Sequence, residues 1–167
     1  MDNEKLRHTA KLTAADWDKT TDRAEHLMAG HKFGCSEALL LAFQEILGTN
    51  LLPPAAVAMS GSFRGGMGGA GCACGALAAG QMVLGAVFGY YGDAEGRQEP
   101  ETVKQARDLY REFHDRFREV NGASCCRSLT KGLALEAPER RARCTEIVRA
   151  AAALTGGLIA REAGTAK

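Results

Sequence analysis

Apolar residues recur at intervals of three and four along most of the chain, the spacing that places side chains on one face of an α-helix. The clearest stripe runs from Cys35 to Leu47, and Gly48 follows it as a typical helix end. The pattern predicts a helix over 35–47. Because Cys35 opens the stripe, we expect its side chain to face the core from the first turn.

Two further helices carry start and stop signals of their own. Thr13 precedes a helix that reaches about Gly30, with Asp16 three residues later in the arrangement of a capping box. Pro100 stands where a charged helix with a narrow apolar seam begins, and Asn121-Gly122 ends it. Both segments are predicted to be amphipathic helices that pack one face on a core.

The C-terminal part of the chain adds two more helices, and both carry cysteines. Ser124 is expected to cap a short helix that contains Cys125 and Cys126. Pro138 is expected to open the last helix, whose apolar stripe begins at Cys144.

The segment from Ser60 to Gly71 differs from the rest because it contains six glycines. It follows a turn at Pro53-Pro54 and the segment 55–59, and it leads into an apolar run from Ala73 to Tyr91. Glycine adopts positive φ at little cost and lets the backbone approach a neighbour closely, so we predict a loop here.

The apolar run must be weighed as a membrane span, because no residue from Gly65 to Gly92 carries a charge. Gly80, Gly85 and Gly89 make it only moderately hydrophobic, and no cluster of Lys and Arg follows it closely. Glycines on a helix let neighbouring helices come close. The composition therefore favours a buried central helix over a membrane span.

Length, composition and charge then bound the class of protein. The chain of 167 residues is predicted to be one all-α domain over 1–167, a single helical bundle of about five to six helices. Its 21 Lys and Arg nearly balance its 20 Asp and Glu, which argues against nucleic-acid binding. Residues 1–5 show no secretory leader, so we expect a reducing, cytoplasmic location.

Six cysteines in a reducing compartment are more often ligands or reactive thiols than disulfides. Three of them lie at or near the first turn of a predicted helix, and a fourth begins the stripe of the last one: Cys35, Cys74, Cys126 and Cys144. Free amides and the helix dipole stabilise a thiolate at such sites. The alternative is that they pack as small apolar residues. CxxC zinc and thioredoxin spacings are absent.

Four cysteine blocks resemble those of a family of redox-active proteins named for the pattern C-GCAxxG-C-C. The blocks are the run 33–38 around Cys35, the glycine loop with Cys74-Gly75-Ala76, the run 126–129 and the run 144–148. Their order and separation match over about 33–153. The chain departs from the pattern at Ala79, where the family has a glycine that here comes one residue later, at Gly80.

The resemblance implies four functional cysteines, namely Cys35, Cys74, Cys126 and Cys144, and genes near transporters. A related arrangement beside the haem domain of split-Soret cytochromes is linked to an iron–sulfur-type centre. Two thiols, Cys72 and Cys125, lie outside the family pattern. They are interpreted as auxiliary thiols, either as a dithiol pair or as part of a different ligand set.

Three hypotheses follow. In the first, the four cysteines are ligands of one iron–sulfur or other metal centre used for electron transfer or redox sensing, and their sulfurs share a pocket. Backbone N–H groups of the loop would bind the sulfurs, from Gly68, Gly69, Gly71 and Gly75. His31 is kept as an outside ligand candidate.

In the second hypothesis the chemistry is metal-free thiol–disulfide exchange, either between Cys74 and Cys126 or through the auxiliary pair Cys72 and Cys125. In the third, the chain is a non-catalytic, transporter-associated binding bundle whose cysteines are structural. The redox partner, independent catalytic turnover and a homodimeric state are left open.

Overall fold

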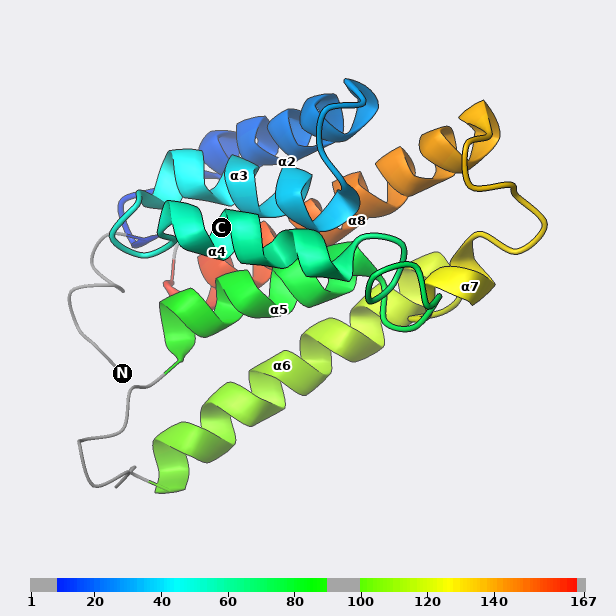
Figure 1. The fold of residues 1–167 in the computed structure, drawn as a ribbon. Coiled ribbons are helices and arrows are strands. Elements are labelled where there is room, and N and C mark those ends of the chain that lie inside the picture. The colour runs from blue at the N-terminus through cyan, green and yellow to red at the C-terminus, as the bar shows by residue number, and fades with distance from the viewer. Residues whose placement is uncertain (1–8, 90–99, 165–167) are drawn as a thin grey trace.

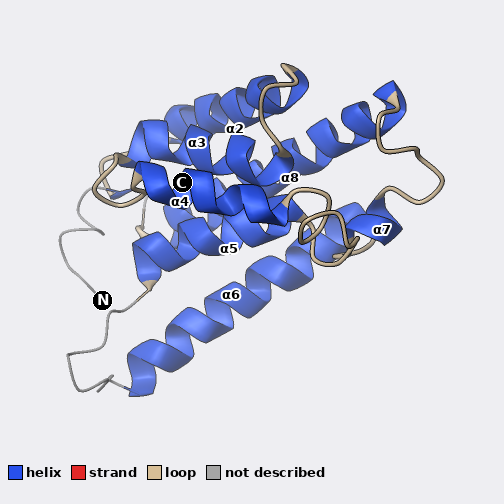
Figure 2. Cartoon of the chain, in the orientation of Figure 1, coloured by secondary structure: helices blue, strands red, loops and turns tan. Residues whose placement is uncertain are grey.

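The computed structural model describes residues 9–89 and 100–164 of the chain. The N-terminal residues 1–5 and the predicted continuation of the central apolar run to Tyr91 lie outside the described residues. The described part holds seven α-helices and one 3-10 turn (Figures 1 and 2). They are α2 (Ala14–Ala29), α3 (Cys35–Leu47), α4 (Pro54–Ser60), η1 (Gly61–Phe63), α5 (Gly75–Phe88), α6 (Pro100–Asn121), α7 (Cys126–Leu129) and α8 (Pro138–Glu162).

The all-α prediction is confirmed. Within the described ranges, the only β pairing is an isolated antiparallel bridge between Ala73 and Cys125. The helix count slightly exceeds the predicted five to six, because α4, with 7 residues, is a helix in addition to those expected from the sequence. None of the helices in the described part is long and apolar enough to cross a membrane.

The helix boundaries agree with most of the capping signals. Thr13 caps α2, since its N–H donates to Asp16 Oδ2 at 2.9 Å and its Oγ1 accepts from the Asp16 N–H at 3.4 Å. Gly48 ends α3 with φ +84°, and Gly122 follows α6 with φ +85°, a conformation that favours glycine.

The prediction that Ser124 caps α7 is wrong. The cap residue is Cys125, in extended conformation, and the helix begins at Cys126. The carbonyl of Ser124 accepts instead from the N–H of Cys74 at 2.9 Å, and the carbonyl of Cys72 accepts from the N–H of Cys126 at 2.7 Å. This short antiparallel pairing keeps the chain extended past Ser124, so the helix starts later than the capping signal indicates.

The predicted buried central helix is α5, which packs against α3, α6 and α8 (Figure 1). A side chain at Gly80 would overlap the ring of Phe113 in α6 and would lie 2.9 Å from Thr155 Oγ1 in α8. The expected close approach is therefore confirmed at Gly80. At Gly85 the nearest atom would be Tyr110 Oη, at an ordinary 3.9 Å. A Cβ at Gly89 would meet a backbone oxygen of α5 itself.

The starts of α3, α5, α7 and α8 meet at one end of the bundle, on the right of Figure 1. Three sets of hydrogen bonds hold this end of the bundle together. Ser36 Oγ donates to the carbonyl of Ser60 at 2.7 Å, which ties α3 to the end of α4. The Cys74 to Ser124 bond ties α5 to α7. Arg141 of α8 donates to the carbonyls of Met28 and, at 3.2 Å, Phe33 in front of α3.

Candidate functional site

Cys35 is the first residue of α3, directly after the cap residue Gly34. Backbone N–H groups of Cys35, Ser36 and Gly75 hydrogen-bond to its sulfur. The helix start is held by Glu37, whose Oε2 accepts from the Gly34 N–H at 2.8 Å. The sulfur thus lies where free amides and the helix dipole both favour negative charge.

Cys74 caps the start of α5 and lies behind Cys35. Its side chain is buried, and its thiol adjoins the Cys35 thiol closely enough for each to shift the pKa of the other. The contact requires glycine at the next position, because a Cβ at Gly75 would overlap Cys35 Sγ and lie 3.1 Å from the Phe63 carbonyl oxygen. Two thiols from blocks far apart in sequence therefore form a direct pair.

The contact makes the two thiols unequal. The hydrogen bond from Cys74, with the backbone N–H groups, lowers the pKa of Cys35 to about 7 even though burial opposes the charge. The hydrogen bond to Cys35, burial and repulsion from the Cys35 thiolate raise the pKa of Cys74. Cys35 is therefore the thiolate of the pair and Cys74 the neutral thiol.

Cys126 and Cys144 approach from α7 and α8. Cys126 is buried, and Arg140 Nη2 lies 3.8 Å from its sulfur. Cys144 lies in the second turn of α8 and is partly exposed. Burial, followed by repulsion from Cys35 and Cys126, raises the pKa of Cys144 to about 11, although Arg140 and Arg141 act in the opposite direction.

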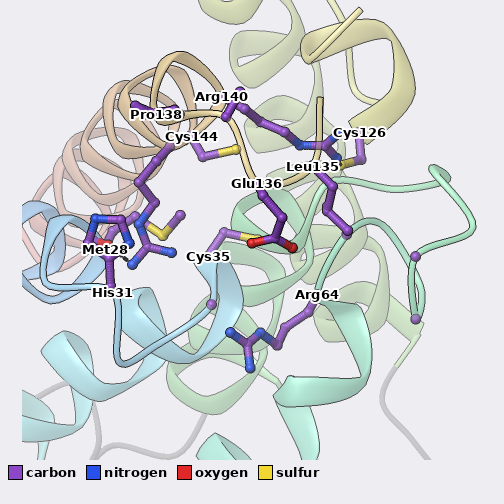
Figure 3. Close-up of a pocket in the computed structure, with 16 residues that line it drawn as sticks. Met28, His31, Cys35, Arg64, Cys126, Leu135, Glu136, Pro138, Arg140 and Cys144 are labelled. Carbon is purple, nitrogen blue, oxygen red and sulfur yellow. Dashed lines mark hydrogen bonds between the residues drawn. The ribbon is translucent and has the colours of Figure 1, made fainter. Parts of the chain in front are cut away.

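A cavity of about 490 Å³ joins these groups. Three of the four predicted cysteines line it, Cys35, Cys126 and Cys144, and their side chains converge on it from different helices (Figure 3). Cys74 does not line the cavity. It lies behind Cys35, and its only described link to the cavity is the contact with Cys35. The structure thus brings the four predicted cysteines to one end of the bundle, with the candidate His31 also in the cavity wall.

The predicted glycines occupy different places around this cavity. Gly68 and Gly69 line it, and the N–H of Gly75 reaches Cys35. Gly71 lies against Arg127, with its Cβ position 3.1 Å from that side chain. That these glycines bind a cofactor stays a prediction. Gly66, another glycine of the loop, packs against Cys126, since a Cβ there would lie 2.6 Å from the Cβ of Cys126.

The auxiliary cysteines lie outside the cavity lining and are exposed. Cys125 stands opposite Ala73 in the bridge, whereas Cys72 bonds through its carbonyl to Cys126. Because side chains alternate along extended chain, Cys72 and Cys125 belong to opposite faces of the bridge. They are not a directly opposed pair here.

The sequence did not predict that several charged residues would line the cavity. Arg64, Glu136, Arg140 and Arg141 all line the cavity. Arg64 is the one charged residue in the glycine-rich segment 60–71, a signal that could have identified it. Nothing in the local pattern around Glu136 points to a site.

The fit of a metal centre can be tested on the donor set. Four thiols are chemically suited to a soft metal ion or an iron–sulfur cluster. Within the described residues, however, no group of three or more His, Cys, Asp or Glu side chains is placed so that it could hold a metal ion. The arrangement is that of one thiol pair with two further thiols across a cavity.

Comparison with known proteins agrees with the cysteine pattern. No curated protein and no solved structure was found to match the chain. A family model described as putative redox-active protein (C_GCAxxG_C_C) matches residues 33–158, which include all four blocks and every cysteine that lines the cavity. The match confirms the resemblance seen in the sequence, and this chain belongs to that family.

Proposed function

We propose that the protein is a thiol–disulfide redox protein whose working pair is Cys35 and Cys74. One observation carries the proposal: Cys35 opens to the cavity and Cys74 lies buried behind it, with the backbone of Gly75 packed against the Cys35 sulfur. This pairing differs from the pairs considered from sequence alone, Cys74 with Cys126 and Cys72 with Cys125.

The arrangement supports a two-step exchange. The Cys35 thiolate attacks one sulfur of a substrate disulfide, forming a mixed disulfide and releasing the first substrate thiolate. Cys74 then passes its proton to the released thiolate, and its own sulfur attacks the sulfur of Cys35. The second substrate thiolate leaves and takes a proton from solvent. The substrate gains two electrons, and the protein is left with a Cys35–Cys74 disulfide.

Access and acidity support this division of roles. The attacking thiol must reach the substrate and be ionised, and Cys35 lines the cavity with its pKa lowered to about 7. The resolving thiol needs only to reach its partner. Burial and the contact with Cys35 keep Cys74 protonated until the mixed disulfide has removed the neighbouring charge.

The predicted metal centre is the second candidate, favoured by the convergence of three cysteines from α3, α7 and α8 on one cavity. Its ligands would be Cys35, Cys74, Cys126 and Cys144, and when bound it would supply one-electron transfer. The donor positions described above do not form a ligand group, so we place this candidate behind the thiol pair.

Anaerobic purification separates the candidates. We expect a colourless protein without bound iron or sulfide. After treatment with 2-hydroxyethyl disulfide, a neutral disulfide, alkylation and mass spectrometry should count two thiols fewer. C35S and C74S should each abolish the loss of this pair, whereas C72S, outside the cavity, should retain it. Iron and sulfide lost in C74S would instead support the metal centre. A colourless protein without iron whose six thiols stay reduced would contradict both and leave the structural-bundle hypothesis.

A further inference from the structure

The cavity wall carries more positive than negative charge. Arg140 and Arg141 enter it from α8 and Arg64 from the glycine-rich segment, and Glu136 is the one carboxylate among the described lining residues; Arg64, Glu136 and Arg140 are labelled in Figure 3. Arg64 is paired with Glu37 outside the lining, at 3.5 Å. Among the ion pairs of the described residues, none neutralises Arg140 or Arg141.

Both of these guanidinium groups are held by uncharged acceptors. Arg140 Nη1 donates to the carbonyl of Leu133 at 3.2 Å, and Arg141 donates to the carbonyls of Met28 in α2 and of Phe33 in front of α3. Such bonds fix a guanidinium in place without cancelling its charge. Arg141 Nε is in addition buried without a hydrogen-bond partner in the described chain. The start of the 25-residue helix α8, at Pro138, adds partial positive charge to the same wall.

The positions of these charges matter for the reaction. Cys35 attacks as an anion and would repel a substrate that is itself an anion. Arg140 Nη2 lies 3.8 Å from Cys126 Sγ, across the cavity from Cys35 (Figure 3), and Arg141 lines the same cavity. Two fixed cations in the wall of the same cavity offset this repulsion and attract a carboxylate on the substrate.

We propose that the substrate of this site is a small anionic disulfide, one that carries carboxylates a few bonds from its sulfur–sulfur bond, and that Arg140 and Arg141 bind those carboxylates. The inference rests on the thiol–disulfide function proposed above and names its substrate class. The chemistry is the two-step exchange already given, with two small carboxylate-bearing thiols as products.

Three disulfides of similar size and different charge test the proposal. They are 3,3′-dithiodipropionate, a dianion; 2-hydroxyethyl disulfide, which is neutral; and cystamine, a dication. The readout is the rate at which each forms the Cys35–Cys74 disulfide in the intact protein. We expect the dianion to react about tenfold faster than the neutral disulfide, and the dication to react more slowly than both.

Variants of Arg140 test whether the cavity wall causes the preference for the anionic disulfide. R140Q should slow the dianion about fivefold and change the neutral disulfide less than twofold, because one unit charge has been removed. R140K keeps the charge and should retain most of the preference. R107Q removes an exposed arginine of α6 outside the cavity lining and should change neither rate.

Binding without chemistry separates a failure of this inference from a failure of the proposed function. Suberate has the length of 3,3′-dithiodipropionate but no sulfur, and 1,8-octanediol is its neutral counterpart. Calorimetry should detect suberate binding to the wild type, weaker binding to R140Q and none of the diol.

Equal rates for all three disulfides, or a preference unchanged in R140Q, would overturn the anionic substrate and leave the thiol pair standing. If no disulfide oxidises Cys35, the proposed function falls. Suberate binding that depends on Arg140 would then still support the anion-binding site. Absence of suberate binding would overturn the anion-binding site as well.

Discussion

At the scale of single residues, the site depends on how one sulfur is surrounded. Cys35 gains its acidity first from the thiol of Cys74 and then from backbone N–H groups at the start of α3 and α5. Cys144 shares the cavity but lacks these donors, and burial moves its pKa in the opposite direction. Local hydrogen bonding, more than membership of the four-cysteine set, sets which of these thiols is the more acidic.

The acidity of Cys35 can be measured with iodoacetamide, which is neutral. Its alkylation rate should rise with pH to a plateau with a midpoint near 7, because a lowered pKa makes the thiolate available above that pH. Cys74→Ala removes the first of its donors, so the midpoint should move up toward the ordinary value of ~8.5. Peptide mass spectrometry follows Cys35 separately from the other thiols. A wild-type midpoint at or above the ordinary value would contradict the assignment.

Gly75 tests the close contact of the pair. Gly75→Ala should push Cys35 away from Cys74, raise the midpoint of alkylation and lower the free energy of unfolding by about 1–3 kcal/mol through overpacking. Gly157→Ala is a matched control, because no atom lies within 4 Å of its Cβ position on the exposed face of α8. This control should be stabilised by roughly 0.5–1 kcal/mol through helix propensity. Equal effects of the two changes would show that the contact is not tight.

At the scale of elements, the bundle is organised around the glycines of α5. Gly80 lets Phe113 of α6 and Thr155 of α8 pack on the helix backbone, while Gly85, one and a half turns further on, has free space. The structural role of a glycine on α5 therefore depends on how closely a neighbouring helix packs against that position.

Two substitutions on α5 measure this difference. Gly80→Ala should lower the free energy of unfolding by about 1–3 kcal/mol, because the new methyl group overlaps Phe113. Gly85→Ala should raise it by roughly 0.5–1 kcal/mol, since Tyr110 Oη lies at an ordinary 3.9 Å. Urea unfolding followed by circular dichroism gives both values. A stabilised Gly80→Ala would contradict the described packing of α5.

The elements were largely predictable from sequence because their signals are local. The Thr13–Asp16 capping box, the stripe that begins at Cys35 and the stop at Gly48 each involve residues within a few turns of one another. The capping prediction for Ser124 was wrong because the interaction that decides it is not local. The carbonyl of Ser124 bonds to Cys74, fifty residues earlier in the chain, and this non-local bond overrides the capping preference.

At the scale of the whole molecule, the site exists because four helix starts meet, and no local pattern encodes which of them touch. The shared placement of the cysteines predicted convergence, but the pairing of Cys35 with Cys74 needs the crossing of α3 and α5 at Gly75. The inward direction of Arg140 and Arg141 likewise depends on the loops in front of α3 and α8. Long-range contacts of this kind leave no periodic signal in a single sequence.

Arg141 tests the long-range tether between α8 and the segment before α3. Arg141→Gln removes donors to the carbonyls of Met28 and Phe33, so the free energy of unfolding should fall by about 1–3 kcal/mol. Arg149→Gln is the control: it breaks ion pairs with Asp22 and Glu25 on the surface, worth roughly 0–1 kcal/mol. Denaturant titration compares the two. A loss no larger for Arg141→Gln than for the control would contradict the tether.

The most direct test of the proposed redox function is the identity of the disulfide that forms first. Reduced protein is treated under nitrogen with less than one equivalent of 2-hydroxyethyl disulfide, quenched in acid, and mapped by mass spectrometry without reduction. The described geometry predicts a Cys35–Cys74 disulfide, with Cys72, Cys125, Cys126 and Cys144 still alkylated as free thiols. A first disulfide between any other cysteines, or a mixed disulfide that stays on Cys35 unresolved, would contradict the pair as the working centre.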